Sequence, residues 1–128
     1  MSTPLISVVD DDASVRAATE NLLKSRGYIV QIFASAEELL RSPQLNETSC
    51  VITDVQMSAM SGLELLAEMR TRGYDAPFIF ITAFPNDRAR ASALGAGAIG
   101  FLAKPFGGQA LIEYIDTALK ACGGRVGI

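Results

Sequence analysis

The segment at residues 5–12, with the sequence LISVVDDD, decides the fold of this chain. Its first half is apolar and β-branched, which is typical of a buried strand, and its acidic half begins where the strand should end. Three later runs have the same form: CVITD ends at Asp54, FIFIT ends at Thr82 and GFLAK ends at Lys104. Together these runs predict a parallel sheet whose strands each end in polar residues.

Helical signals separate the apolar runs. Asp12 can cap a helix over residues 13–26, and Ser35 with Glu38 forms a capping box for a short second helix. Gly62 begins a third helix. A fourth helix is expected to end near residue 94, and a fifth is expected to contain Leu111. Strands are expected at residues 5–9, 28–33, 50–54, 77–82 and 99–103. This alternation predicts one α/β domain, a doubly wound (βα)5 parallel sheet with helices on both faces.

Composition narrows the functions open to the chain. It has 128 residues, a net charge of −3 and no cluster of Lys and Arg, which argues against direct binding of nucleic acid or of an anionic membrane. No signal peptide or membrane-length apolar run is evident, and the sparse cysteines, Cys50 and Cys122, fit a reducing compartment, so a cytoplasmic protein is expected. The absence of histidine excludes Ser-His-Asp hydrolases, Cys-His proteases and His-bound zinc.

The residues that end the strands predict one polar site. In an open α/β sheet, ligands bind outside the carboxyl ends of the strands, so Asp10, Asp11, Asp54, Thr82 and Lys104 should converge. Carboxylates held close together repel one another, and a bound Mg²⁺, which prefers oxygen ligands, would relieve that repulsion. The hydroxyl and the ammonium suit phosphoryl oxygens, and a carboxylate such as Asp54 can form an acyl phosphate.

As a set, these motifs resemble the receiver domain of two-component response regulators. The matching segments are VVDDD at 8–12, VITDVQM at 51–57, MSGLELL at 60–66, FIFITA at 78–83 and GFLAKPF at 100–106. The KPF ending is similar to the FixJ-like branch of that family. The resemblance implies a flavodoxin-like strand order of 2-1-3-4-5, a receiver domain over residues 1–121 and a flexible Gly-rich tail over residues 122–128.

The resemblance also implies a role for each site residue. Asp54 would accept a phosphoryl group from the phosphohistidine of a sensor histidine kinase or a phosphotransfer protein. Asp11 and Asp54 would bind Mg²⁺, for which Mn²⁺ could substitute, together with the main-chain carbonyl of Gln56, and Asp10 would act through water. Lys104 would contact the phosphoryl group. In these terms the chain catalyses only its own phosphorylation and dephosphorylation, and we do not expect a conventional enzyme.

A conformational switch follows from the same resemblance. Thr82 would move inward to bond the phosphoryl group, and Phe101 would turn inward with it. The fourth helix, fifth strand and fifth helix would then signal to an output domain or effector protein, and phosphorylation could drive homodimer formation. Pairing with the kinase would depend on the first helix, on residues that include Ala13, Ser14, Arg16 and Ala17.

The chain departs from the family pattern at several positions around the site. Ser58 follows Met57 where the family often has proline, and Ala103 precedes the lysine where an acidic residue is common. Phe84, two residues after Thr82, is bulky and apolar, and we hypothesise that it hinders the water that would remove the phosphoryl group. Gln56 and Phe84 are therefore candidate modulators of the dephosphorylation rate.

Three other classes of protein share some of these features. A phosphatase of the haloacid dehalogenase type would need a second aspartate two residues after its nucleophile, where this chain has Gln56. A flavodoxin would need an uncharged phosphate loop after the first strand, where this chain has three aspartates. A degenerate receiver used only for protein contacts would have no need of all five site residues, and it remains the alternative.

Overall fold

The computed structural model describes the backbone of residues 3–126 and the side chains of residues 3–120. The strands are β1 (Leu5–Val9), β2 (Ile29–Phe33), β3 (Thr48–Asp54), β4 (Phe78–Thr82) and β5 (Gly100–Ala103). The helices are α1 (Ala13–Ser25), α2 (Ala36–Leu40), α3 (Gly62–Thr71), α4 (Asp87–Gly95) and α5 (Gly108–Val126), with a 3₁₀ turn, η1, at Leu45–Glu47. The strands are all parallel in the order β2-β1-β3-β4-β5, which confirms the doubly wound sheet and its order.

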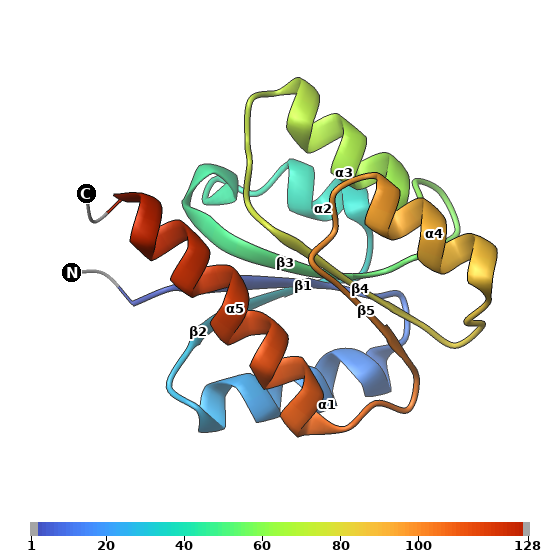
Figure 1. The fold of residues 1–128 in the computed structure, drawn as a ribbon, viewed down its shortest axis with the longest axis horizontal. Coiled ribbons are helices and arrows are strands. Elements are labelled where there is room, and N and C mark those ends of the chain that lie inside the picture. Colours follow the sequence, from blue (N-terminus) through green and yellow to red (C-terminus); the bar gives the residue numbers. More distant parts are fainter. Residues whose placement is uncertain (1–2, 127–128) are drawn as a thin grey trace.

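Helices cover both faces of the sheet. Figure 1 shows α1 and α5 on one side and α2, α3 and α4 on the other. Within β4, Phe78 and Phe80 pack into the cluster that contains Leu65 of α3, whereas Ile79 and Ile81 pack into the cluster of α1 and α5. Successive side chains of a strand point to opposite faces. A central strand buried on both faces is therefore apolar at nearly every position, as the sequence pattern predicted.

The edge strand β2 differs from the central strands. It pairs only with β1, and Ile29 and Ile32 are 54% and 37% exposed. Alternation of apolar and polar residues predicted one more exposed face, but Ile29 and Ile32 lie on opposite faces and Gln31 is half-buried, so the exposure follows from the position of the strand at the edge of the sheet. The strand begins at Ile29 rather than at residue 28, because the Tyr28 amide donates to the carbonyl of Leu23 at the end of α1.

Strand β3 begins with polar residues, which were not predicted to belong to a strand. The strand begins at Thr48 rather than at residue 50, because Thr48 pairs with Leu5 and its hydroxyl lies 2.8 Å from that of Ser7. The turn η1, just before it, was not predicted. Strands β4 and β5 each begin one residue later than expected, at Phe78 and Gly100.

The C-terminal helix extends further than its sequence suggested. The backbone of α5 is helical to Val126, so the Gly-rich segment predicted as a tail begins within that helix. The side chains after Lys120, Cys122 included, and residues 127–128 lie outside the described residues, and the flexibility of residues 122–128 stays a prediction. No helix in the described part of the chain is long and apolar enough to cross a membrane.

Candidate functional site

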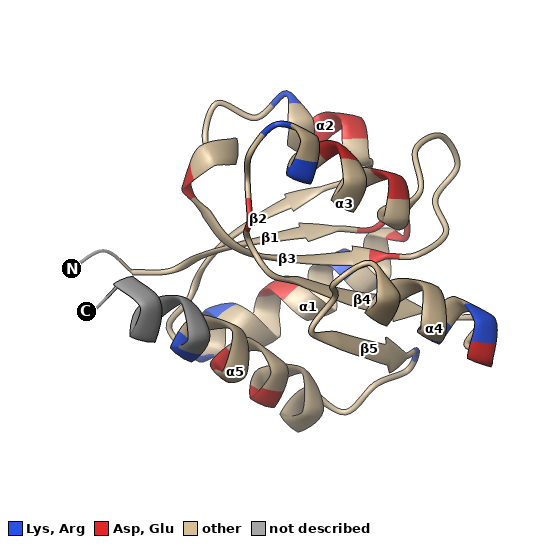
Figure 2. Cartoon of the chain, turned by 45° about the horizontal axis from the view of Figure 1, so that its top comes forward, with Lys and Arg blue, Asp and Glu red and all other residues tan. Residues whose placement is uncertain are grey.

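The carboxyl ends of four strands bring the predicted site residues together. Asp10 follows β1, Asp54 ends β3, Thr82 ends β4 and Lys104 follows β5. The Lys104 amide donates a 2.7 Å hydrogen bond to the carbonyl of Thr82, which continues the β4–β5 pairing to the edge of the site. In Figure 2 acidic positions mark the end of β3 and a basic position follows the tip of β5. The sheet therefore places carboxylates and an ammonium at one edge.

Lys104 lies between two carboxylates. Its Nζ is 2.8 Å from Asp10 Oδ2 and 2.9 Å from Asp54 Oδ2, and its side chain is only 13% exposed. Burial by itself would lower the pKa of Lys104, but the hydrogen bonds and charges of the two carboxylates outweigh it and hold that pKa above its ordinary value. The ammonium is therefore charged at neutral pH.

Asp10 is the most deeply buried member of the site. Its side chain is fully buried, and its Oδ1 accepts a 2.8 Å hydrogen bond from the Asp12 amide. Its Oδ2 is held by the Lys104 ammonium at 2.8 Å. Burial raises the pKa of Asp10 more than the neighbouring ammonium lowers it.

The three aspartates fit a hard divalent cation. Asp10, Asp11 and Asp54 each offer one carboxylate oxygen, and these oxygens all lie within 4.8 Å of one another. An all-oxygen donor set with an exposed member, Asp11, matches the preference of Mg²⁺ for one or two carboxylates and several waters.

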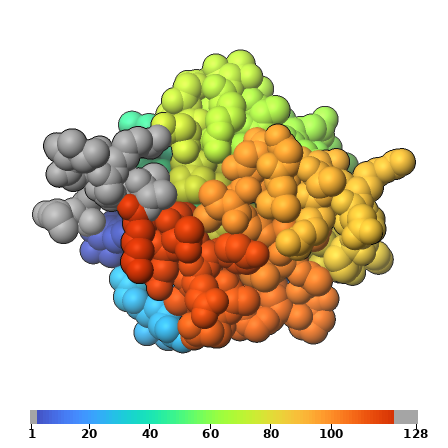
Figure 3. Space-filling model, viewed as in Figure 1, coloured from blue at the N-terminus to red at the C-terminus, as the bar shows by residue number. Residues whose placement is uncertain are grey.

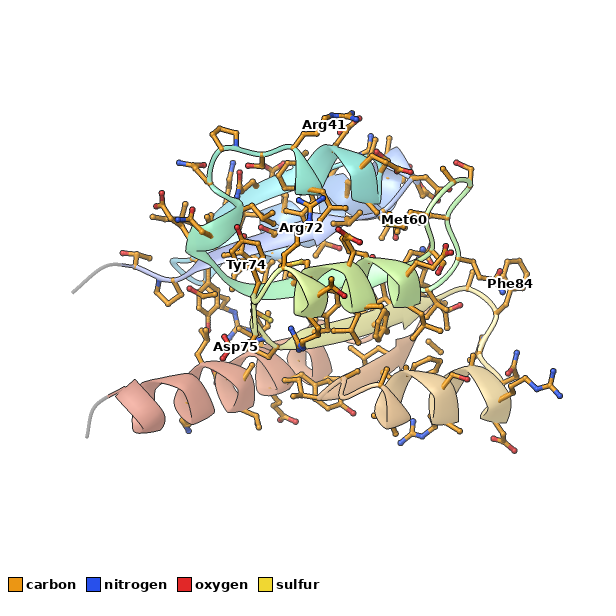
Figure 4. The ribbon with its side chains drawn as sticks, turned by 90° about the horizontal axis from the view of Figure 1, so that it is seen from above. Arg41, Met60, Arg72, Tyr74, Asp75 and Phe84 are labelled. Atoms are coloured by element: carbon orange, nitrogen blue, oxygen red, sulfur yellow. The ribbon has the colours of Figure 1, made fainter. Side chains whose placement is uncertain are left out.

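Asp54 faces an open pocket. Its Oδ1 accepts a 3.1 Å hydrogen bond from the Gln56 amide, and its side chain is 10% exposed. The pocket has a volume of about 280 Å³ and is lined by Asp11, Asp12, Asp54, Gln56, Ala83, Phe84 and Lys104. Phe84, at its rim, is 68% exposed and projects outward from the β4–α4 loop (Figure 4). An anion the size of a phosphoryl group can thus reach the Asp54 carboxylate from solvent.

Thr82 and Phe101 lie beneath the surface near this pocket. Thr82 is 1% exposed, and its Oγ1 accepts a 3.1 Å hydrogen bond from the Phe84 amide. Phe101 is 6% exposed and belongs to the same core cluster as Phe80, its partner across the β4–β5 ladder. A hollow of about 240 Å³ beside it is lined by Pro85, Asn86, Asp87, Arg90, Phe101 and Ala103.

Two residues that shape the site were missed by the sequence analysis. Arg16, for which a part in kinase recognition stays a prediction, also donates a 2.6 Å hydrogen bond from Nη1 to the carbonyl of Asp10. Gly62 opens α3 so close to the acceptor strand that a Cβ there would clash with the Asp54 carbonyl oxygen and lie 2.9 Å from Phe80 Cε1. The Arg16–Asp10 and Gly62–Asp54 contacts each join residues fewer than ten positions apart, but neither was predicted, because each depends on how a helix is oriented against the strand that precedes it.

Comparison with known proteins agrees with this geometry. The family model described as the response regulator receiver domain matches residues 6–116. Nodulation protein W of Bradyrhizobium diazoefficiens is 37% identical over 91% of this chain and 51% of its own length. The transcriptional regulatory protein FixJ of the same organism is 33% identical over 90% of this chain and 56% of its own length. This chain thus spans about half the length of the curated relatives it matches.

Solved structures extend the likeness to three dimensions. The crystal structure of FixJ-N has a TM-score of 0.83 and 32% identity, and the match covers 94% of this chain and 96% of that one. The Vibrio cholerae chemotaxis protein CheY4 has a TM-score of 0.84 and 27% identity, and the match covers 92% of this chain and all of that one (100%). The chain belongs to the response regulator receiver domain family and has the flavodoxin-like fold of these neighbours.

Proposed function

We propose that Asp54 accepts a phosphoryl group from a phosphohistidine of a sensor histidine kinase or phosphotransfer protein, in a reaction that requires Mg²⁺. One observation carries this proposal. The Asp54 carboxylate opens onto a solvent-accessible pocket between an acidic cluster and the Lys104 ammonium. No histidine is present in the chain, so the phosphohistidine must come from a partner.

The chemistry is a transfer between two nucleophiles. An oxygen of Asp54 forms the new O–P bond while the N–P bond of the donor breaks, and its electron pair returns to the imidazole nitrogen. Lys104 neutralises charge on the phosphoryl oxygens, and the Thr82 hydroxyl binds one of them after it moves inward. Asp11, Asp54 and the Gln56 carbonyl would hold Mg²⁺, with Asp10 acting through water, and the cation would supply further charge neutralisation when bound.

A groove beside the site supports docking of the phosphodonor. It has a volume of about 550 Å³ and lies between α1 and the loop that joins β5 to α5. Its lining is mostly apolar, with Val15, Ala18 and Leu22 on one side and Pro105 and Phe106 on the other. An apolar partner surface seated there would bring its histidine to the adjacent pocket. Exposed Ala13, Ser14 and Ala17 on the same helix would add to pairing specificity.

Signalling would leave the domain through the surface made of α4, β5 and α5. Figure 3 shows α4 and α5 as neighbouring parts of one face, and Figure 2 shows β5 between them. Phosphorylation would shift Thr82 and Phe101 together toward their inward conformations and so change the shape of this surface. An output domain, an effector protein or a second copy of the chain would then recognise the changed surface. In this proposal the protein works in the cytoplasm, and this chain does not itself bind nucleic acid.

Phe84 and Gln56 would set how long the phosphoryl group persists. Both line the pocket at its open side, where a water molecule must approach the acyl phosphate. Phe84→Glu replaces an apolar ring with a group that can orient water, so we expect faster loss of phosphate, measured by intact mass over time. A variant that keeps its phosphate as long as the parent would contradict this role.

The decisive experiment is phosphorylation by acetyl phosphate with and without Mg²⁺, followed by intact mass. We expect a Mg²⁺-dependent gain of one phosphoryl group that disappears in Asp54→Ala. Asp87→Ala, which alters an exposed carboxylate at the start of α4, is the matched control and should still be labelled. No labelling of the parent under any condition would favour the degenerate, contact-only receiver.

A further inference from the structure

Arg16 reaches back from α1 onto the loop that carries the acidic cluster. Its Nη1 donates a 2.6 Å hydrogen bond to the main-chain carbonyl of Asp10, and its side chain is partly buried. A charge-assisted hydrogen bond of this length is among the stronger contacts that an arginine makes. One end of the guanidinium is thus engaged within the chain.

The contact acts on one particular peptide unit. The Asp10 carbonyl and the Asp11 amide belong to the same planar group, so the direction of the carbonyl sets the direction in which the chain enters Asp11. On the other side of Asp11 in the chain, the Asp12 amide donates a 2.8 Å hydrogen bond to Asp10 Oδ1. These two hydrogen bonds hold the main chain on either side of Asp11, whose side chain is exposed.

We propose that Arg16 is a positioning residue for the cation site: by holding the Asp10 carbonyl, it sets where the Asp11 carboxylate lies. The inference deepens the proposed function and rests on its Mg²⁺ site. Two effects of Arg16 on that site oppose each other. A nearby positive charge repels a cation, whereas a preorganised ligand binds it more tightly, so removal of the side chain gives opposite signs for the two roles.

Arg16→Met tests which effect dominates. This substitution keeps the length of the side chain and removes its donors and its charge. Arg26→Met is the control for charge. Arg26 is the C-cap of the same helix, and its main chain lies about 15 Å from that of Arg16 along the helix axis, so this substitution removes the same charge far from the site. Mg²⁺ affinity is measured by isothermal titration calorimetry. We expect Arg16→Met to bind Mg²⁺ about fivefold more weakly, as for loss of one hydrogen bond, and Arg26→Met to match the parent.

Arg16→Lys separates position from charge. It keeps the positive charge but has no planar fork to direct at the Asp10 carbonyl, so we expect a smaller loss of Mg²⁺ affinity that electrostatics cannot explain. If Arg16→Met does not fold, as judged by circular dichroism, this variant carries the test alone. Mg²⁺ binding as tight as, or tighter than, that of the parent in the folded variants overturns the proposal.

A measurement without divalent cations keeps this inference distinct from the proposed function. Amide hydrogen exchange at Asp11 and Asp12, followed by NMR, should be faster in Arg16→Met than in the parent and in Arg26→Met. If the parent binds no Mg²⁺, the proposed cation site fails, while faster exchange still shows that Arg16 orders the loop. Unchanged exchange in Arg16→Met overturns the positioning role.

Discussion

At the scale of single residues, Lys104 controls the balance of charge in the site. Its ammonium contacts two carboxylates, and that of Asp10 has no exposure to water. Removing one partner of a buried ion pair is costly, because the remaining charge stays buried without compensation. Lys104 should therefore affect folding stability as well as phosphorylation.

Lys104→Met should lower the free energy of unfolding by about 3 kcal/mol at pH 7 in the absence of divalent cations, measured by urea denaturation. Lys24→Met is the matched control, since the Lys24–Glu20 ion pair is on the surface and the Lys24 side chain is 57% exposed. It should cost less than about 1 kcal/mol. The double variant Asp10→Asn/Lys104→Met should recover much of the loss, and equal costs for the two lysines would contradict the prediction.

The same substitution should have a defined pH dependence. Because the folded state raises the pKa of Asp10, it holds this proton more tightly than the unfolded chain does. Stability from this group is fully present below the ordinary carboxyl pKa of about 4 and is lost as pH rises through the raised value. Lys104 partly offsets that loss, so the cost of Lys104→Met should grow from pH 5 to pH 7. A cost that is constant or falls over this range would argue against a buried, uncompensated Asp10.

At the scale of elements, the start of α3 is fitted against the end of β3. The Gly62 amide donates a 2.9 Å hydrogen bond to the carbonyl of Val55, and Ser61 and Glu64 form a capping box for the helix. A side chain at Gly62 has no room beside the Asp54 carbonyl. The position of the acceptor loop thus depends on a residue without a side chain.

Gly62→Ala should therefore lower the free energy of unfolding by about 2 kcal/mol, because the helix must shift to avoid overlap. Gly95→Ala provides the contrast: it is also a helical glycine, and a Cβ there meets nothing within 4 Å. That variant should be neutral or more stable by up to about 1 kcal/mol, from helix propensity. Urea unfolding of the two variants checks the prediction, and similar values would refute the packing argument.

Tyr28 links the start of β2 to α5. Its hydroxyl donates a 3.1 Å hydrogen bond to Asp116 Oδ1, and partial burial, followed by this carboxylate, raises the pKa of the phenol above its ordinary value of about 10. The stability from this group is therefore present below pH 10 and lost as pH rises through the raised pKa.

Titration of tyrosine absorbance should show this link. The difference in absorbance between the parent and Tyr28→Phe reports the ionisation of Tyr28, and this step should occur above pH 10. Asp116→Asn should move the ionisation step of Tyr28 to lower pH. Glu113→Gln, a neutral substitution at another exposed acidic position of α5, is the control and should leave the step in place. A Tyr28 step at or below pH 10 in the parent would contradict the prediction.

Local signals predicted these elements well and their junctions less well. The caps at Asp12 and Ser35 are as expected, because a cap needs only neighbouring residues, but the Glu38 carboxylate accepts from the Ala34 amide and not from that of Ser35, so the predicted capping box is only half formed. The start of β3 at Thr48 was missed because its polar residues are satisfied by β1, which is remote in sequence. The buried residues of α3 are Gly62, Leu65, Leu66 and Met69, whose spacing forms one helical stripe that faces the core.

At the scale of the whole molecule, convergence of three carboxylates lowers the stability of the folded state. Their oxygens lie within 4.8 Å of one another, and like charges so close repel. An ion that binds the folded but not the unfolded chain stabilises it by mass action, by about 2.7 kcal/mol at a concentration 100 times its Kd. Folding and cation binding should therefore be coupled.

Mg²⁺ should raise the thermal unfolding midpoint by several degrees, whereas NaCl at equal ionic strength should not. Asp11→Asn should be more stable than the parent without Mg²⁺, because one repelling charge is gone, and should respond little when Mg²⁺ is added. Differential scanning calorimetry measures both midpoints. Equal Mg²⁺ responses of the parent and this variant would place the bound cation elsewhere.

The order of elements and the members of the site were determined by the sequence alone. Continuous apolar runs, caps and glycines act between near neighbours, and the rule that parallel strands end at one edge was enough to predict that Asp54, Thr82 and Lys104 lie together. Only the tertiary structure decided that Lys104 pairs with Asp10 as well as Asp54, and that Arg16 holds the Asp10 carbonyl. The Lys104 contacts depend on strand register between segments remote in sequence, and the Arg16 contact depends on how α1 is oriented against the end of β1.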